Sequence, residues 1–242
     1  MGAQWKHAGR IESSSKRGAL ISKLVKEITV AAKSGDPNPD NNPRLRAGIE
    51  AAKKASVPRD TIERAIKKGA GLLDDGVHYE TVFYEGFAPH RVPVIVECLT
   101  DNKNRTAADV RVLFRRGQLQ SIGSVTWMFD RMGVIEAIIA KKAVDIEEAA
   151  IEAGAQNVEA LDANEVSAGH TGARFFCDPK DLDMVSKGVT QLGWTVSACE
   201  ISYIAKSMVQ LNEEQKKETV DFLNAIDDHD DVHRIYTALS NK

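Results

Sequence analysis

The cationic side chains gathered in the first third of the chain are the clearest candidates for chemistry. Residues 1–71 hold 15 Lys and Arg against 7 Asp and Glu, a net charge of +8, whereas residues 72–242 hold 17 against 28, a net charge of −11. Long cationic side chains on one surface neutralise phosphates and release condensed counterions, so this asymmetry favours a polyanionic partner for the first segment. The alternative is that these charges only solvate helix faces. The predicted nucleic-acid-binding residues are Lys6, Arg10, Lys16, Arg17, Lys23, Lys26, Lys33, Arg44, Arg46, Lys53, Lys54, Arg59, Arg64, Lys67 and Lys68.

Two other features could contact a nucleic acid. Trp5 precedes the first predicted helix, where it could stack on an unpaired base or anchor the arm to the first domain. The polar loop 100–106 lies between a predicted strand and a predicted helix, so its backbone N–H groups and Arg105 could hold an anion. Alternatively, the side chains of Asn102 and Asn104 cap that helix. Both alternatives remain open for each feature.

No catalytic signature is present in the sequence. It contains no P-loop, no dinucleotide-binding glycine pattern and no nucleophile elbow, so we predict no catalytic residue and no cofactor. His229 and His233 have a spacing that could hold a metal on a helix, but no further His or Cys nearby completes a site. We therefore predict an acidic, solvated turn around them and no metal. The protein is predicted not to be an enzyme.

Cysteine usage and hydropathy indicate a cytoplasmic protein. Cys98, Cys177 and Cys199 each lie in an apolar run, where a free thiol behaves as a small buried hydrophobe, and this pattern is typical of a reducing compartment. No apolar stretch approaches the roughly 20 residues that span a bilayer. The first residues lack the apolar core of a secretory signal. We therefore expect no membrane association.

The basic segment is predicted to be helical. Apolar residues at three- and four-residue spacing predict a first helix that follows Ser13–Ser15 and ends at Gly35, with Lys23, Lys26 and Lys33 on the opposite face. Asn42 followed by Pro43 is typical of the start of a second helix. A third is predicted from Pro58 to Gly69, where glycine ends it.

The remainder alternates between strands and helices. Strands are predicted over 79–87, 92–100 and 124–130, with a helix over 107–116. Residues 133–204 then show the order β-α-β-β-α-β, which is the ferredoxin-like arrangement. A last helix over 212–226 and a strand over 232–239 cannot fold alone, so we expect them to return to the strands of 79–131.

The fold class is therefore α+β: a helical N-terminal domain followed by two α/β domains, the last a ferredoxin-like insertion. The predicted domains are a basic helical domain at 1–75, a discontinuous α/β domain at 76–131 plus 207–242, and an inserted domain at 132–206. The acidic domains could bind a protein partner.

Several long motifs resemble the YebC/PmpR family. They are KRGALISKLVKEITVAAKSG at 16–35, NPRLRAGIEAAKKASVPRDTIERAIKKG at 42–69, YEGF at 84–87, VIVECLTDNKNRT at 94–106 and GSVTWMFDRMGVI at 123–135. The resemblance implies three domains, a monomer and no enzymatic activity. It implies a DNA-binding transcriptional regulator or, as the alternative, a ribosome-associated translation factor that binds ribosomal RNA and relieves stalling.

The chain departs from the family pattern in three places. Near the N-terminus the family usually has glycine-histidine-serine-lysine-tryptophan, and this chain has Gly2-Ala3-Gln4-Trp5-Lys6-His7. The family is glycine-rich after its YEG motif, where this chain has APHR at 88–91. The usual paired glycines before GSV are replaced by RGQLQ at 116–120. A partner that touches these turns would meet a changed surface.

Overall fold

The computed structural model describes residues 14–73, 76, 78–140, 144–162, 166 and 168–240. In the first helix, side chains are described from Arg17 onward. Contacts divide the chain into two compact units. One comprises Met1–Val30, Asp74–Asp130 and Tyr203–Lys242, and the other comprises Ala31–Leu73 and Arg131–Ser202.

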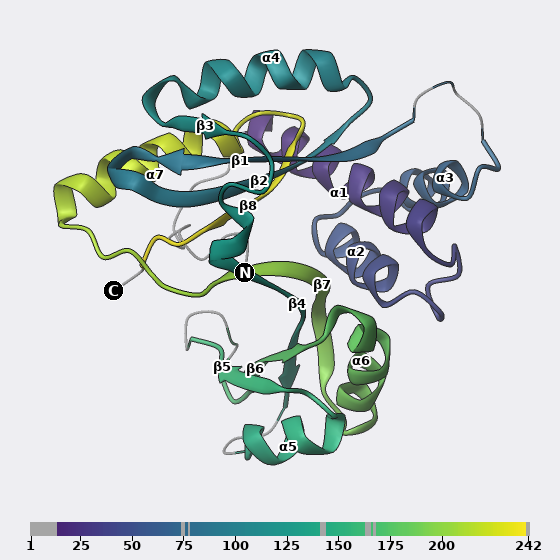
Figure 1. The fold of residues 1–242 in the computed structure, drawn as a ribbon. Helices are drawn as coiled ribbons and strands as arrows, with labels where there is room; N and C mark the ends of the chain where they lie inside the picture. The colour runs from purple at the N-terminus through teal and green to yellow at the C-terminus, as the bar shows by residue number, and fades with distance from the viewer. Residues whose placement is uncertain are drawn as a thin grey trace. The chain divides into compact units, whose positions relative to one another are not determined.

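Three helices form the first part of the chain. They are α1 (Ser14–Ser34), α2 (Pro43–Lys54) and α3 (Arg59–Gly69). Asn42 caps α2 and Pro43 occupies its first turn, as the sequence predicts. The three predicted helices are therefore confirmed (Figure 1). The boundaries that were predicted for them lie within two residues of the observed ones.

The first unit is built on an antiparallel sheet of four strands. They are β1 (Glu80–Ala88), β2 (Val92–Thr100), β3 (Gln118–Gln120) and β8 (Val232–Thr237), in the order β3-β1-β2-β8. The short 3-10 turn η1 (Pro89–Arg91) joins β1 to β2. A second one, η2 (Phe114–Arg116), precedes β3. Because β8 pairs with β2, the C-terminal segment returns to the strands that follow the helices.

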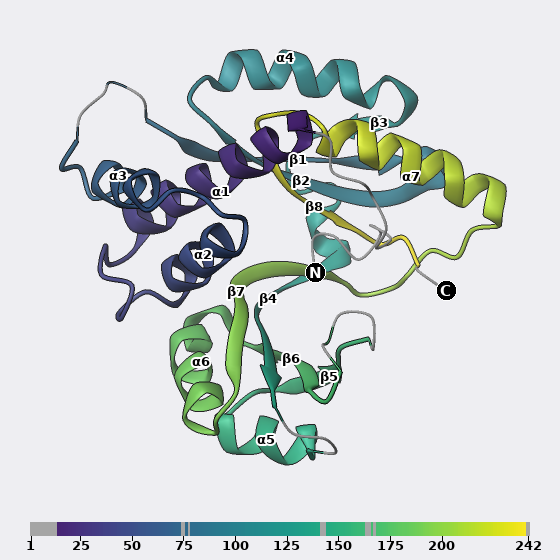
Figure 2. The ribbon, with the colours of Figure 1, turned by 180° about the vertical axis from the view of Figure 1, so that it is seen from behind.

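Alternation along the buried strand β2 separates two cores. Val94 and Val96 pack with the helices α4 (Lys103–Leu113) and α7 (Glu213–Asp227), whereas Ile95 packs with Phe129 and Tyr236 on the other face. Successive side chains of a strand point to opposite faces, so one strand supplies both cores. Figure 2 shows α4 and α7 beside the strands of this sheet from behind.

The second sheet has the ferredoxin-like order that the sequence predicts. Its strands are β4 (Phe129–Ile139), β5 (Asn157–Ala160), β6 (Thr171–Cys177) and β7 (Thr195–Ala205), in the order β5-β6-β4-β7. The helices α5 (Ile146–Ala153) and α6 (Leu182–Gln191), the latter preceded by η4 (Pro179–Asp181), pack on one face of this sheet. Phe175 and Trp194 meet edge to face there, with ring centroids 5.4 Å apart.

Two predicted boundaries are wrong. Residues 124–130 were expected to form a strand, but Thr126–Met128 form the 3-10 turn η3 and β4 begins only at Phe129. The helix expected from Ala107 begins four residues earlier, at Lys103, because Asn102 caps it. The short strand β3 was not predicted; it follows the 3-10 turn and pairs with β1.

The three cysteines are buried free thiols, as predicted. Burial raises the pKa of Cys98 to about 12, that of Cys177 to about 11 and that of Cys199 to about 12. They are therefore protonated and packed as apolar groups. In the part of the chain described, no helix has both the length and the apolar character needed to cross a bilayer.

The turn between β1 and β2 carries backbone strain. His90 and Arg91 have φ values of 61° and 60°, in the left-handed region that side chains with a Cβ disfavour by roughly 1–2 kcal/mol each. Replacing Arg91 with glycine should therefore raise the free energy of unfolding by about 0.5–1 kcal/mol, after the entropy that glycine adds to the unfolded chain. Chemical denaturation measures this change. The control Arg115→Gly, in the 3-10 turn η2 where φ is not positive, should destabilise instead; stabilisation of both would contradict the account.

Candidate nucleic-acid interface and the Asp231 pocket

Helices α2 and α3 expose cations because each buries only a narrow apolar stripe. α2 buries Leu45, Gly48 and Ala52, and α3 buries Ile62 and Ala65. Side chains three or four residues apart share a helix face, so the remaining faces point away from that core. The exposed cations of the two helices are Lys53, Lys54, Arg59, Arg64 and Lys67.

One buried amide fixes the start of α2. Asn42 is 7% exposed, and its Oδ1 accepts a hydrogen bond of 3.0 Å from the Leu45 N–H. Its Nδ2 donates to the carbonyl oxygens of Ala31 and Asp36, both at 2.9 Å. A Cβ at Gly35 would lie 2.7 Å from that Nδ2, so the end of α1 requires glycine. These contacts position α2 and its cations.

The exposed cations differ in how they are paired. Lys53 Nζ lies 2.7 Å from an oxygen of Glu50, and Arg59 Nε lies at the same distance from one of Glu63. Such exposed pairs stabilise a protein by about 0–1 kcal/mol, so a phosphate can replace the carboxylate. The remaining cations have no hydrogen bond or ion pair with any residue of the described ranges: Lys54, Arg64 and Lys67.

The other predicted binding residues, apart from Lys23 and Lys26, fall into two groups. Some lie outside the described residues or have side chains that do: Trp5, Lys6, Arg10 and Lys16. Others are exposed or partly buried on the helix surfaces: Arg17, Lys33, Arg44, Arg46 and Lys68. Arg46 donates to the carbonyl oxygens of Pro39 at 3.1 Å and Asp40 at 2.8 Å, which closes the loop before α2.

The two remaining lysines of α1 are turned toward protein rather than solvent. Lys23 Nζ donates to the Asp227 carbonyl oxygen at 2.5 Å, and Lys26 Nζ donates to the Asp230 carbonyl oxygen at 3.0 Å. Both side chains are largely buried, being 17% and 13% exposed. The expected open face opposite the apolar stripe of α1 is therefore covered at these positions. Helical periodicity predicts which side chains share a face of α1. It does not predict that a segment 204 residues away in sequence packs on that face.

Asp231 is the centre of a hydrogen-bond network. It is 4% exposed, and its Oδ1 accepts from Lys26 Nζ at 3.0 Å. Its Oδ2 accepts from Arg105 Nη2 at 2.9 Å, from Thr106 Oγ1 at 2.9 Å and from Thr100 Oγ1 at 3.3 Å. Burial alone would raise the pKa of Asp231, but the hydrogen bonds from Arg105, Lys26 and Thr106 outweigh it and lower the pKa to about 2. The carboxylate therefore stays charged.

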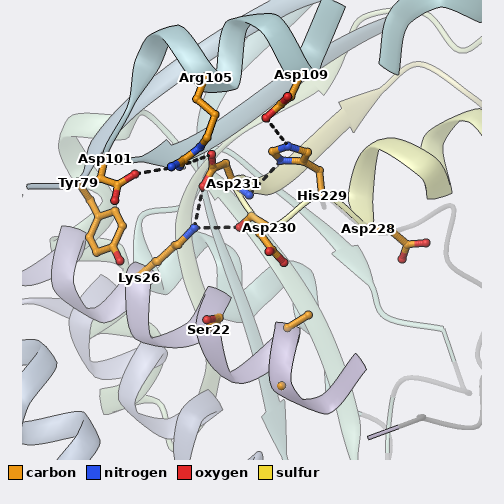
Figure 3. Close-up of a pocket in the computed structure, with 12 residues that line it drawn as sticks. Ser22, Lys26, Tyr79, Asp101, Arg105, Asp109, Asp228, His229, Asp230 and Asp231 are labelled. Carbon is orange, nitrogen blue, oxygen red and sulfur yellow. Dashed lines mark hydrogen bonds and ion pairs between the residues drawn. The ribbon is translucent and has the colours of Figure 1, made fainter. Parts of the chain in front are cut away.

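A pocket of about 800 Å³ opens beside this network (Figure 3). Its lining includes the small residues Gly18, Ala19 and Ser22 of α1 and the ring of Tyr79. The charged part of the lining is mainly acidic: Asp101, Asp109, Asp228, Asp230 and Asp231, with Lys26 and Arg105. Both cations are bound to carboxylates, so this pocket does not suit a phosphate.

His229 forms hydrogen bonds with two segments that line that pocket. Its Nδ1 accepts the Asp231 backbone N–H at 3.1 Å, so in the neutral ring the proton lies on Nε2. That Nε2 lies 3.2 Å from Asp109 Oδ2, to which it can donate. Figure 3 shows His229 between Asp109 and the Asp231 backbone. The histidine links α4 to the segment before β8.

The solvated turn predicted around His229 and His233 is wrong for part of its length. Asp231 is buried, and His233 Nε2 lies 2.8 Å from Oε2 of Glu27, which is 5% exposed. Arg234 lies 3.6 Å from the other oxygen of Glu27. Over the ranges that the structure describes, no three His, Cys, Asp or Glu side chains converge as metal ligands would.

The segment 100–106, predicted to be a loop, shows the capping alternative, because α4 already begins at Lys103 within it. Asn102 Oδ1 accepts the Arg105 backbone N–H at 3.1 Å at the start of α4. The Arg105 guanidinium donates to Asp101 Oδ1 at 2.8 Å as well as to Asp231, which raises the pKa of Arg105 further. Asn104 is exposed. Anion binding by this loop remains a prediction, and its arginine is already paired.

Sequence reasoning missed Glu85, which is 3% exposed in β1. Its carboxylate accepts backbone N–H groups from Gly123 at 2.7 Å and from Val125 and Thr126, both at 2.8 Å. Burial raises its pKa, but these hydrogen bonds prevail and lower it. The available signal was alternation: Glu85 shares a strand face with the apolar residues Phe83 and Phe87, where an unpartnered carboxylate would be unstable.

Comparisons with known proteins agree with the fold. A family model described as the TACO1/YebC protein N-terminal domain matches residues 3–72, and one described as the TACO1/YebC second and third domain matches residues 79–239. A crystal structure of a conserved hypothetical protein from Aquifex aeolicus is 40% identical in sequence with a TM-score of 0.81. That similarity covers 98% of this chain and 96% of that chain.

Curated relatives extend over the full length. A Pseudomonas syringae pv. tomato protein named probable transcriptional regulatory protein is 51% identical over 242 residues, which cover 99% of this chain and 100% of the relative. A Bdellovibrio bacteriovorus protein with the same descriptive name is 50% identical over 241 residues, with the same coverage. The predicted resemblance is therefore confirmed, and the chain belongs to the TACO1/YebC family.

Proposed function

We propose that this protein is a non-enzymatic regulator of gene expression that binds nucleic acid through the exposed cations of α2 and α3. The observation that carries the proposal is a set of exposed cations that are not paired with any described residue, namely Lys54, Arg64 and Lys67. They lie in the segment that has a net charge of +8. The names of the relatives, as probable transcriptional regulatory proteins, support DNA as the partner.

The mechanism is electrostatic docking. These side chains neutralise phosphates of a duplex and release the counterions condensed on it, and the weakly paired Lys53 and Arg59 can exchange a carboxylate for a phosphate. Phosphate contacts fix position and give little sequence discrimination, so base readout needs further residues. We further propose a cytoplasmic monomer with domains at 1–75, 76–131 plus 207–242, and 132–206, whose acidic domains are free to meet a protein partner.

Equilibrium binding to a labelled DNA duplex tests the proposal. With roughly 6–10 phosphate contacts, affinity should fall about 10³–10⁵-fold between 50 and 200 mM salt. Fluorescence anisotropy across a salt series measures this dependence. Failure to bind duplex DNA and ribosomal RNA at 50 mM salt would contradict the proposal.

A second experiment separates transcription from translation. Nucleic acid crosslinked to the protein in cells would be recovered after sedimentation of the lysate through a sucrose gradient. Discrete DNA fragments away from the ribosome peak would support the transcriptional role. Ribosomal RNA within the ribosome peak would instead support the alternative, a ribosome-associated translation factor.

A further inference from the structure

The loop of residues 121–128 is anchored at several points, first by three backbone N–H groups that donate to Glu85. Ser124 N–H donates to the Ser121 carbonyl oxygen at 3.2 Å, and the two serine hydroxyl oxygens lie 3.0 Å apart. Val125 is fully buried in the core that also contains Phe129. A loop anchored by a buried carboxylate and a core residue keeps its exposed side chains in fixed places.

This loop presents large apolar side chains to solvent. Ile122 is 82% exposed and Trp127 is 64% exposed. Tryptophan carries one of the largest apolar surfaces of any side chain, and exposed aromatic residues on rigid supports are typical of binding surfaces. The loop therefore orders Trp127 without burying it.

The hydrogen bond of Trp127 narrows the kind of partner. Its indole Nε1 donates to the Ser124 carbonyl oxygen at 3.0 Å. A tryptophan that becomes buried usually needs a hydrogen-bond partner for this N–H. Here the donor is already used within the loop, so the ring offers its π-face. A flat group that stacks without needing a hydrogen bond from the ring, as a nucleobase does, fits this arrangement.

A cation lies beside the same loop. The Lys206 backbone N–H donates to the Met128 carbonyl oxygen at 3.0 Å, which places Lys206 next to the end of the loop. Its Nζ lies 3.4 Å from Asp130 Oδ1, and the two side chains are 50% and 59% exposed. So exposed a pair is weak, and a phosphate can take the place of the carboxylate. The chain segments that carry Trp127 and Lys206 are therefore neighbours, joined by the backbone hydrogen bond between Lys206 and Met128.

We propose that Trp127 stacks on an unpaired base of a single-stranded nucleic acid while Lys206 contacts its backbone phosphate. This inference rests on the proposed function, because it names a second contact of the same partner. It adds a surface outside α2 and α3 and a preference for strands whose bases are accessible.

The test uses the full-length chain and two labelled 12-nucleotide single-stranded DNAs, one normal and one with abasic residues that keep every phosphate. On the normal strand, Trp127→Ala should weaken binding about 5- to 150-fold, and Trp127→Phe should retain most of the affinity. On the abasic strand, the wild type and Trp127→Ala should bind equally. Both variants lose the exposed hydrogen bond from the Trp127 indole to Ser124, so thermal unfolding should change only slightly in each.

Three results would overturn the inference, and each is distinguishable from failure of the proposed function. The first is equal binding of wild type and Trp127→Ala to the normal strand. The second is an equal loss by Trp127→Ala on both strands, which would exclude a role for the base. The third is capture of an apolar protein partner by Trp127 with no effect on DNA binding. In all three the wild type still binds DNA in a salt-dependent way; absence of that binding would count against the proposed function itself.

Discussion

Replacing Asp231 with alanine is expected to lower the free energy of unfolding by about 3–5 kcal/mol, the largest effect of any single substitution considered. The substitution removes a buried carboxylate that Lys26, Arg105 and Thr106 share as an acceptor, and each of these donors loses that hydrogen bond. Chemical denaturation at neutral pH measures the loss. The control is Asp228→Ala in the same segment, because Asp228 is exposed and its replacement should change stability by less than about 0.5 kcal/mol.

The pH dependence of stability separates the charge of Asp231 from its shape. Its pKa falls from 3.8 in the unfolded chain to about 2 in the folded protein. A lowered folded-state pKa stabilises the protein above pH 3.8, and that stabilisation, roughly 2 kcal/mol, is lost as the pH falls toward 2. The difference in unfolding free energy between wild type and Asp231→Asn should therefore shrink across this range. Parallel pH profiles would contradict the proposed network.

Replacing Glu85 with glutamine should destabilise the protein by about 2–4 kcal/mol. The carboxylate accepts from Gly123 with one oxygen and from Val125 and Thr126 with the other. A glutamine keeps one acceptor oxygen and turns an NH₂ toward at least one backbone N–H, which leaves buried donors unsatisfied at about 1–3 kcal/mol each. Glutamine has nearly the same size and shape as glutamate, so the expected loss of stability comes from the changed hydrogen bonding and not from packing.

Amide hydrogen exchange gives the local readout for that variant. In Glu85→Gln, the amides of Gly123, Val125 and Thr126 should lose protection, while the β1–β2 ladder keeps it. Glu80→Gln on the same strand is the matched control, because the Glu80 side chain is 53% exposed and should affect neither stability nor exchange. Retained protection in Glu85→Gln would contradict the anchoring role.

Local signals predicted the elements that local chemistry determines. Asn42-Pro43 marks a helix start because the amide side chain caps the orphan N–H groups and proline needs no hydrogen bond there. Gly154, with φ of 77°, ends α5 where a left-handed residue is needed. The ferredoxin-like order could be predicted because strand and helix periods alternate cleanly over residues 133–204.

Long-range contacts explain what was not predicted. The segment 124–128 is apolar and β-branched, so local pattern favours a strand, but Glu85 takes the N–H groups that a strand would give to a neighbour. Lys23 and Lys26 look like ligand-binding residues until α7 and the residues after it are placed beside them. Asp231 looks solvated within its acidic run, and only the folded chain surrounds it with donors.

Because the proposed interface is limited to the exposed cations of α2 and α3, only some substitutions give informative tests of binding. Charge reversal at Lys23 or Lys26 would break contacts with Asp227 and Asp231, so lost binding could reflect lost folding. Lys54, Arg64 and Lys67 make no such contacts with described residues, and glutamine is tolerated on an exposed helix face. These three positions therefore test binding without testing stability.

The salt dependence of DNA binding by the triple variant Lys54→Gln, Arg64→Gln and Lys67→Gln is the most direct measurement. Each lost phosphate contact reduces the slope of log affinity against log salt by about 0.9, so the slope should decrease in magnitude by about 3 relative to wild type. The matched control, Lys180→Gln, Lys187→Gln and Lys217→Gln, removes the same charge from exposed positions elsewhere and should keep the wild-type slope. Equal slopes for wild type and both variants would contradict binding through α2 and α3.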